Sequence, residues 1–421
     1  MTVNRSIISL FSGAMGLDQG LEQAGFRTAL AVEINKSAVQ TIQLNKPRLP
    51  LFAKPIEKIS SAEILTVTKL KAGEPCLVTG GPCCQSFSTV GKRESFGNPR
   101  GNLFLHFKRI VAETQPRFFV MENVKGILSA AVRHRPLNDR GPGNLPLTQD
   151  EQLGSALKVI LRELAELNYY IIFGLVNAAD YGVPQKRWRV IFIGSRDGEN
   201  IQLPKPTHTE DQNNCLQPWV TLRDAIGNLN EKKPEYHPFA QERLSLLKLL
   251  KAGENWTDLP KHLQRTALGA AYDSWGGRVG FCRRLDWNEP SPTLTTSPTG
   301  RATTLCHPGK LRPLTVGEYA TLQQFPKDWQ FSGSNQQKYI QIGNAVPVGL
   351  GHAIGKVLRQ TMAKTEKHGL PTDAQKKRGV VICDEALQKR ITNRKKTQLH
   401  PAHLLKNSDP KEIKKWLEKA S

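Results

Sequence analysis

The sequence predicts an α/β protein: a mostly parallel sheet covered by helices on both faces, joined to a smaller, irregular domain. Short apolar segments alternate with segments of helical periodicity through the first 194 residues. This alternation is typical of strand–helix–strand units, which produce parallel sheets. Between residues 199 and 334 the alternation decays, and Pro, Asn, Gln, Thr and Gly become frequent. We therefore expect that region to form the smaller domain.

The expected elements follow one another in a regular order. Six short apolar segments are expected to be strands: 6–10, 29–32, 76–78, 118–121, 169–175 and 189–194. Four segments with apolar residues at helical spacing lie among them: 17–23, 36–43, 103–114 and 152–167. The helical pattern returns in segment 335–360.

Length and charge limit what the chain can be. Its 421 residues suffice for one large domain or two ordinary ones, and 38% hydrophobic residues suffice for a packed core. The formal charge of +22 and the pI of about 9.8 favour a polyanionic partner such as nucleic acid, although a merely soluble basic protein has the same balance. Segment 361–421 carries 15 Lys and Arg against 7 Asp and Glu. We expect it to be a solvated extension, with a DNA-binding arm as the alternative.

The seven cysteines are odd in number and include no Cys-x-x-Cys pair. This pattern argues against a disulfide framework or a zinc site and favours a reducing cytosol, so no metal is expected. No apolar stretch is long enough to cross a membrane. The apolar residues after Arg5 could imitate a secretory signal, but Ser12, Gly13 and Gly16 interrupt them, so no signal peptide is expected.

Two of the expected strands lead into chemically reactive side chains. Segment 76–78 continues into Gly81-Pro82-Cys83-Cys84, and segment 118–121 continues into Glu122. Open α/β sheets bind ligands at the carboxyl ends of their strands, so a thiol and a carboxylic acid there can act as nucleophile and proton donor in one cleft. Taken separately, each has a plainer interpretation: Cys84 as a spare thiol in a turn, and Glu122 as a solvated loop residue.

Five motifs in order strengthen the chemical interpretation. They are Phe11-Ser12-Gly13-Ala14-Met15-Gly16, the Pro-Cys-Gln-type loop at Cys84, Glu122-Asn123-Val124, Gln185-Lys186-Arg187-Trp188-Arg189 and Gly343-Asn344-Ala345-Val346-Pro347. Over roughly residues 6–350 the chain resembles the cytosine-5 DNA methyltransferase family. The resemblance implies a Rossmann-like, S-adenosylmethionine-dependent catalytic domain over 1–198 and 335–360 and a target-recognition domain over 199–334. The basic C-terminal extension expected over 361–421 lies beyond the family's motifs.

The first motif, considered by itself, fits a nucleotide-binding turn. Gly13 and Gly16 stand between an expected strand and a helix, and Glu33 follows Gly13 by 20 residues, where a carboxylate can bind ribose hydroxyls. That pattern alone leaves NAD open, whereas the resemblance implies S-adenosylmethionine, converted to S-adenosylhomocysteine. It implies a pocket lined by Phe11, Gly13, Gly16, Glu33, Ile34, Pro82, Leu103, Asn344 and Val346.

One adenine contact stays open at this point. The third motif of the resembled family usually carries an Asp for the adenine amino group. The comparable stretch here is Lys54-Pro55-Ile56-Glu57, with Pro55 in place of the acid.

The resemblance also implies the catalytic roles. Cys84 is the expected nucleophile toward C6 of a cytosine, and Glu122, expected to be buried, donates or shares a proton at N3. Cys83 stands where the family usually has a second proline, and Cys84 is preferred as the nucleophile because it directly precedes Gln85.

Arginines are expected to complete the catalytic site. Arg187 and Arg189 would hold the cytosine carbonyl, the flipped nucleotide or Glu122, because a guanidinium has a fixed charge and fork geometry. The alternative is that segment 186–189 is an exposed basic start of a strand. Asn123 is expected to shape the loop after Glu122.

The remaining expectations concern DNA. A duplex hides C6 within the base stack, so the cytosine is expected to be flipped out. Segment 284–293 resembles the family's ninth motif, with Arg-Leu-Asp, Pro and Thr in order. The loop after the nucleophile and the glycine-rich stretch before this motif supply the candidate DNA contacts: Gln85, Ser88, Lys92, Arg93, Arg278, Arg283 and Arg284.

The expected function is DNA cytosine-5 methylation by a bacterial modification enzyme or an orphan methyltransferase. Its partners would be double-stranded DNA and, in a restriction–modification system, a cognate endonuclease. We expect a monomer in the cytoplasm, associated with the nucleoid.

Three other functions compete with this expectation. Transfer of methyl groups to tRNA by the same fold usually comes with a Cys-Phe-Thr signature, which the sequence lacks. A DNA-binding module with a retired active site conflicts with intact Cys84, Glu122 and Arg189. A cytosine deaminase would need a Pro-Cys-x-x-Cys element, which is also missing from the sequence.

Overall fold

The computed structural model describes residues 4–82, 103–136, 139–140, 144–211, 215–273, 279–372 and 376–382. Eight strands in these residues form one sheet with the order β12-β6-β8-β5-β4-β1-β2-β3. Their bounds are Ser6–Leu10 for β1, Arg27–Val32 for β2, Leu51–Phe52 for β3, Leu77–Gly80 for β4, Phe118–Val124 for β5, Tyr170–Asn177 for β6, Trp188–Ser195 for β8 and Gly379–Ile382 for β12. All neighbours are parallel except that β8 runs antiparallel to both β5 and β6. The expected α/β class with a mostly parallel sheet is confirmed.

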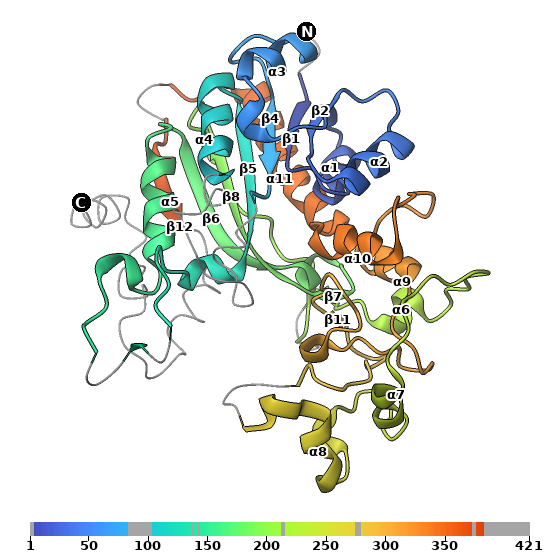
Figure 1. The fold of residues 1–421 in the computed structure, drawn as a ribbon. Helices are drawn as coiled ribbons and strands as arrows, with labels where there is room; N and C mark the ends of the chain where they lie inside the picture. Colours follow the sequence, from blue (N-terminus) through green and yellow to red (C-terminus); the bar gives the residue numbers. More distant parts are fainter. Residues whose placement is uncertain are drawn as a thin grey trace.

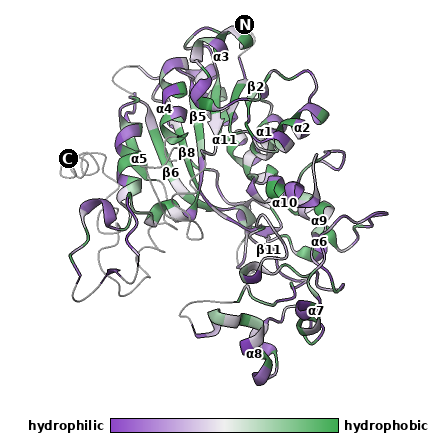
Figure 2. Ribbon diagram, viewed as in Figure 1, coloured by the Kyte–Doolittle hydropathy of each residue, from purple (hydrophilic) through white to green (hydrophobic). Residues whose placement is uncertain are grey.

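Helices cover both faces of the sheet (Figure 1). One face packs against α3 (Ser61–Thr68), α4 (Leu103–Thr114) and α5 (Ser155–Ala165). The other face packs against α1 (Gly16–Gln23) and the long α11 (Val348–His368), which lie against each other. The central strands are mostly apolar in Figure 2, as expected for strands that are buried on both faces. The helices expected at 17–23, 36–43, 103–114 and 152–167 correspond to α1, α2 (Lys36–Asn45), α4 and α5.

Local sequence sets where the first helices begin. The side chain of Asn35 accepts hydrogen bonds from the backbone N–H groups of Ser37 and Ala38, which caps α2. Ser60 and Glu63 form a reciprocal capping box at the start of α3. Such caps satisfy backbone donors that have no partner within the helix. The cap at Asn35 matters for function because it fixes the chain directly after Glu33.

The smaller part of the structure contains short elements separated by irregular segments. These elements are β9 (His208–Thr209), β10 (Gln217–Pro218), α6 (Leu222–Ile226), α7 (Gln241–Leu247), α8 (Lys261–Leu268), β11 (Ser291–Pro292) and α9 (Val316–Leu322). One apolar cluster joins α6 and α9 to α10 (Asn335–Asn344), and a second forms around α7 and α8. Figure 1 shows α8 at the end of the molecule farthest from the large sheet.

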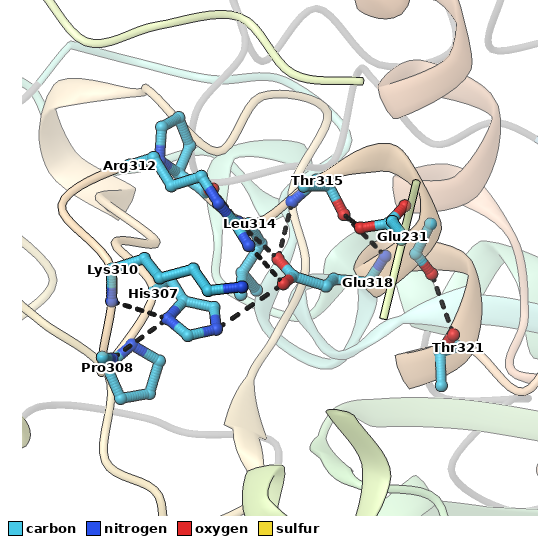
Figure 3. A network of polar contacts seen from close by, with 12 residues as sticks. Glu231, His307, Pro308, Lys310, Arg312, Leu314, Thr315, Glu318 and Thr321 are labelled. Carbon is cyan, nitrogen blue, oxygen red and sulfur yellow. Dashed lines mark hydrogen bonds and ion pairs between the residues drawn. The ribbon is translucent and has the colours of Figure 1, made fainter. Parts of the chain in front are cut away.

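A buried polar network strengthens this irregular region (Figure 3). Arg312 donates two hydrogen bonds to the carboxylate of Glu318, at 2.7 and 2.8 Å. The backbone N–H of Thr315 donates to the same carboxylate, and the Thr315 hydroxyl donates to Glu231. Nδ1 of His307 accepts from the backbone N–H groups of Gly309 and Lys310. Side chains thus satisfy backbone groups that a regular sheet would otherwise pair.

The C-terminal part of the chain differs from expectation. Helix α11 continues through residue 360 to His368, and β12 pairs with β6 in parallel register, Gly379 opposite Tyr170. Val380 and Ile382 are buried in the same apolar cluster as α5. Within the expected extension, residues 361–368 therefore complete α11, and residues 379–382 add an edge strand to the large sheet. Residues 383–421 lie outside the described part of the chain.

Among the residues that the structure describes, no helix is both long and apolar enough to span a bilayer.

Candidate active site and cofactor site

The chain leaves β4 directly beside Glu122. In the β4–β5 pair, Gly80 lies opposite Met121, so the next residues, Gly81 and Glu122, are neighbours at the sheet edge. A Cβ on Gly81 would lie 2.9 Å from Oε2 of Glu122, which leaves room only for glycine unless the carboxylate moves. Pro82 follows and is buried. The loop that carries the expected nucleophile therefore starts against the carboxylate.

The nucleophile itself lies outside the described residues. Cys83, Cys84, Gln85, Ser88, Lys92 and Arg93 all fall in the undescribed range 83–102, and Arg278 falls in 274–278. Their expected roles stay predictions.

Glu122 forms an ion pair with Arg189. The distance between Arg189 Nε and Glu122 Oε1 is 2.6 Å, and both side chains are nearly buried. The two residues reach each other because β5 and β8 are antiparallel neighbours, with Val124 opposite Arg189. Burial lowers the pKa of the Arg189 guanidinium, and the charge of Glu122 opposes that shift. Of the two expected arginines, Arg189 is the one that contacts the carboxylate.

Asn123 ties the end of β5 to the start of the nucleophile loop. Its Nδ2 donates to the carbonyl oxygen of Pro82 at 3.4 Å, and its Oδ1 accepts from the backbone N–H of Val124 at 2.8 Å. These bonds agree with the expected role of Asn123 in shaping the loop.

Arg187 occupies a different environment from the one expected. Its side chain is 1% exposed, and its Nη1 and Nη2 donate to the carbonyl oxygens of Leu294 and Gly343 at 3.0 and 2.8 Å. Burial moves its pKa well below the ordinary value for arginine. These contacts are with backbone, not with Glu122. Arg187 was expected to hold the cytosine carbonyl, the flipped nucleotide or Glu122. Its hydrogen bonds to Leu294 and Gly343 instead join three segments of the chain, and a contact with the cytosine stays a prediction.

Glu33 at the tip of β2 organises the cofactor turn. Its Oε2 accepts from the backbone N–H of Gly13 at 2.7 Å. Its Oε1 accepts from the N–H groups of Ile34 and Asn35 at 2.8 and 2.7 Å. A carboxylate held in this way beside a glycine turn has the position from which ribose hydroxyls can be bound.

The two glycines of the turn have different reasons to be glycine. Gly13 has φ +52°, a conformation that favours glycine, and no atom lies within 4 Å of where its Cβ would be. A Cβ on Gly16 would lie 2.2 Å from the carbonyl oxygen of Val346. Gly16 thus permits close approach of the 343–347 segment, which brings two of the five motifs together.

The other expected cofactor residues lie around the same sheet edge. Phe11 and Leu103 are half-buried and pack against the apolar cluster of α4 and α5. Val346 is buried, Asn344 is exposed, and Ile34 is 63% exposed. Exposed Ile34 beside the Glu33 carboxylate offers an apolar surface on which an adenine ring could stack. The residues present therefore fit S-adenosylmethionine.

The structure places no acidic side chain at position 55, where the resembled family usually carries an Asp for the adenine amino group. Pro55 precedes a short 3-10 turn, Ile56–Lys58, and Glu57 in that turn is exposed.

Two arginines expected to read DNA contact the protein itself. Arg283 Nε donates to the carbonyl oxygen of Thr304, and burial lowers the pKa of Arg283 to about 10. Arg284 donates to the carbonyl oxygens of Leu250 and Pro308. These bonds favour a structural role for both side chains in holding irregular loops together.

Comparison with known families decides the identity. The family model for C-5 cytosine-specific DNA methylase matches residues 5–360. The chain belongs to this family. It is therefore an S-adenosylmethionine-dependent DNA cytosine-5 methyltransferase.

Curated relatives of this methyltransferase are type II methyltransferases. M.Sau96I of Staphylococcus aureus is 34% identical over 353 residues, covering 84% of this chain and 75% of the relative. M.PspPI of Psychrobacter is 35% identical and covers 84% of this chain and 78% of the relative. M.Eco47II of Escherichia coli is 33% identical and covers 86% and 80%.

Solved structures agree with the fold. A protein described as a prophage-encoded DNA modification methyltransferase from E. coli has a TM-score of 0.57 and 25% identity, covering 85% of this chain and 99% of that one. The Entamoeba histolytica methyltransferase EhMeth has a TM-score of 0.52 at 16% identity, over 85% of this chain and 99% of its own. At that identity the likeness concerns the fold of the methyltransferase only.

Proposed function

We propose that the methyltransferase acts on a cytosine flipped out of duplex DNA, through a transient bond between Cys84 Sγ and cytosine C6. The observation that carries the proposal is the position of Gly81 and Pro82 against the Glu122–Arg189 pair, at the sheet edge that also carries Glu33. Cys84 follows Pro82 by two residues. Nucleophile, acid and cofactor turn then share one end of the sheet, where open α/β sheets bind ligands.

The two oxygens of Glu122 support a division of roles. Oε1 is held by Arg189 Nε, whereas Oε2 is the oxygen nearest to Gly81. We assign Oε2 to N3 of the cytosine, because it lies on the side where the nucleophile loop begins. Arg189 would keep the carboxyl group oriented while a proton is shared at N3. It would also offset negative charge that develops in a buried site, where such interactions are strong.

Methyl transfer to cytosine C5 would proceed through addition to C6, methylation and elimination. The Cys84 thiolate adds to C6, the ring electrons move toward N3 and C5, and Glu122 donates or shares a proton at N3. S-adenosylmethionine, when bound at the Glu33 turn, supplies the electrophilic methyl group for C5. A base or water removes the C5 proton, and the thiolate leaves C6 by elimination. Extrusion of the base from the duplex costs roughly a few kcal/mol, which DNA contacts would offset.

The biological setting follows from substrate and relatives. We propose modification of DNA within a restriction–modification system, with a cognate endonuclease acting on the same site. The +22 charge suits a duplex DNA partner. A monomer in the bacterial cytoplasm, close to the nucleoid, would suffice for this activity.

The proposal is tested by supplying labelled S-adenosylmethionine with unmethylated duplex DNA of mixed sequence and, separately, with tRNA. We expect 5-methylcytosine in DNA alone. Label in tRNA alone would overturn the DNA substrate, and no label in either would leave a DNA-binding module.

A matched pair of variants tests the nucleophile. Cys84→Ala should abolish turnover, while Cys83→Ala should largely retain it. Duplex DNA with 5-fluorocytosine should become covalently attached to the wild type in the presence of methyl donor, and peptide mapping should locate the bond at Cys84. Attachment at Cys83, or turnover by Cys84→Ala, would refute the assignment.

A further inference from the structure

A buried pair of glutamine side chains joins the cofactor segment to the recognition region. Gln185 lies in β7 (Gln185–Lys186), Gln323 follows α9, and both are 0% exposed. Nε2 of Gln185 donates to Oε1 of Gln323 at 2.9 Å. Buried amides of this kind are uncommon unless their hydrogen-bonding capacity is used.

Gln323 holds the segment that lines the expected cofactor pocket. Its Nε2 donates to the carbonyl oxygens of Ile342 and Ala345 at 2.6 and 3.1 Å. The backbone carbonyl oxygen of Gln323 accepts from the N–H of Val348, the first residue of α11. Asn344 lies between the two carbonyls that Gln323 binds. The side chain thus fixes the backbone of the 342–346 segment, which also packs against Gly16.

Gln185 holds the recognition region in the same way. Its Oε1 accepts from the backbone N–H of Leu294 at 2.9 Å, two residues after β11. The β11 strand itself pairs with β7, Ser291 opposite Gln185. Arg187 closes the junction, since it bonds both the carbonyl oxygen of Leu294 and that of Gly343.

The orientation of both amides is fixed by their partners. Gln185 must present oxygen to the N–H of Leu294, so its NH₂ group faces Gln323. Gln323 must then present oxygen to Gln185 and its NH₂ group to two carbonyls. Only one arrangement satisfies every donor and acceptor. A shift of either backbone segment therefore breaks bonds at the other.

Close packing supports the same connection. A Cβ on Gly343 would lie 2.4 Å from the carbonyl oxygen of Thr295, so the two segments touch with backbone against backbone. A side chain at residue 343 would therefore push the two segments apart.

We infer that Gln185 and Gln323 are positioning residues that couple the affinity for the cofactor to the binding of DNA. This inference rests on the proposed function. DNA that engages the recognition region would fix the 291–295 segment, and the glutamine pair would transmit that constraint to residues 342–346. By linkage, the cofactor product must strengthen DNA binding by the same factor.

The test measures the dissociation constant of S-adenosylhomocysteine by calorimetry, with and without a DNA fragment that the wild type has been shown to methylate. For the wild type we expect DNA to tighten binding at least about 5-fold. Gln185→Met keeps the volume and the Gln323 bonds to residues 342 and 345. It removes the bond to Gln323 and the acceptor for the N–H of Leu294 and for Nη1 of Arg187. It should bind S-adenosylhomocysteine alone within about 2-fold of wild type, with the DNA effect reduced below about 2-fold.

A second variant and a matched control sharpen the result. Gln323→Met should weaken binding of S-adenosylhomocysteine even without DNA and also lose the DNA effect. Gln341→Met is the control: it removes a different buried glutamine, in α10, whose side chain bonds to Thr41 and Ser332. It should retain the wild-type coupling. A DNA effect of wild-type size in Gln185→Met, or none in the wild type, would overturn the inference.

Failure of the proposed function gives a different result, since the wild type would then methylate no DNA fragment. If Gln185→Met and Gln323→Met both fail to fold, hydrogen exchange of the wild type tests the coupling. S-adenosylhomocysteine without DNA should slow exchange in the peptide that covers Leu294. Unchanged exchange there would contradict coupling through this junction.

Discussion

Arg189 and Glu122 meet across the antiparallel strands β8 and β5, with 2.6 Å between Arg189 Nε and Glu122 Oε1. The pair is buried at the edge of the sheet where the nucleophile loop begins. A buried charge that loses its partner is strongly unfavourable, so the two residues depend on each other.

Removal of Arg189 should therefore impair chemistry more than binding. We expect Arg189→Ala to lower kcat by about 10²–10³-fold, because an electrostatic contact to the reacting site is lost. Arg189→Lys should recover part of the rate, since it restores charge without the guanidinium geometry. Single-turnover methyl transfer measures the effect, with exposed Arg162→Ala as control. A rate within 3-fold of wild type for Arg189→Ala would contradict the role.

Glu33 should determine cofactor affinity. Glu33→Ala removes the acceptor for Gly13, Ile34 and Asn35 and the expected ribose contact. We expect the KM for S-adenosylmethionine to rise by about 10–100-fold with a much smaller change in kcat, because charged hydrogen bonds contribute roughly 1.5–3 kcal/mol. Exposed Glu57→Ala is the comparison. Equal weakening by both variants would instead place the adenine near Glu57.

Sequence patterns were sufficient where local signals decide the structure. The positions of Glu33 directly after β2 and of Glu122 near the end of β5 follow from apolar segments that lead into polar residues. The Gly13 turn follows from its place between a strand and a helix. The sheet edge collects these residues because parallel strands share a carboxyl end.

The difference between the two arginines could not be predicted in this way. Arg187 and Arg189 are two residues apart and would share one face of a continuous strand. The structure ends β7 at Lys186 and begins β8 at Trp188, so Arg187 lies in the interruption and turns toward backbone carbonyls. No periodic signal marks that interruption.

Long-range pairing explains two further differences. β12 pairs with β6 although Gly379 and Tyr170 are far apart in sequence, and the basic composition around β12 conceals a short apolar strand. Arg283 and Arg284 were expected at DNA because they are basic and follow glycines. In the structure they donate to carbonyls of irregular loops, which have no sheet partners.

The edge strand β12 should contribute to stability. Ile382→Ala truncates a buried side chain in the cluster that includes α5. We expect a loss of about 2–5 kcal/mol in the free energy of unfolding. Val381→Thr, at a half-buried position of the same strand, should cost less. Urea unfolding measures both, and an unchanged midpoint for Ile382→Ala would show that β12 is not part of the cooperative unit.

His307 should make stability depend on pH in the acid range. Burial is the largest cause that lowers its pKa to about 4 in the folded protein, although the charge of Glu318 opposes the shift. Nδ1 of the neutral ring accepts from the N–H groups of Gly309 and Lys310, so protonation there would break both bonds (Figure 3). In the unfolded chain the pKa is about 6.5.

The sign follows from these two values. Above pH 6.5 both states hold a neutral ring, and the full stability is present. As the pH falls from about 6.5 to about 4, the unfolded chain takes up the proton first, so stability decreases by up to about 3 kcal/mol. Below about pH 4 this contribution becomes constant.

His307→Asn keeps an acceptor but does not titrate, so its unfolding free energy should vary less between pH 7 and pH 4. His262→Asn, on an exposed position of α8, should leave the wild-type slope unchanged. Parallel pH profiles for the wild type and His307→Asn would show that another group causes the acid sensitivity.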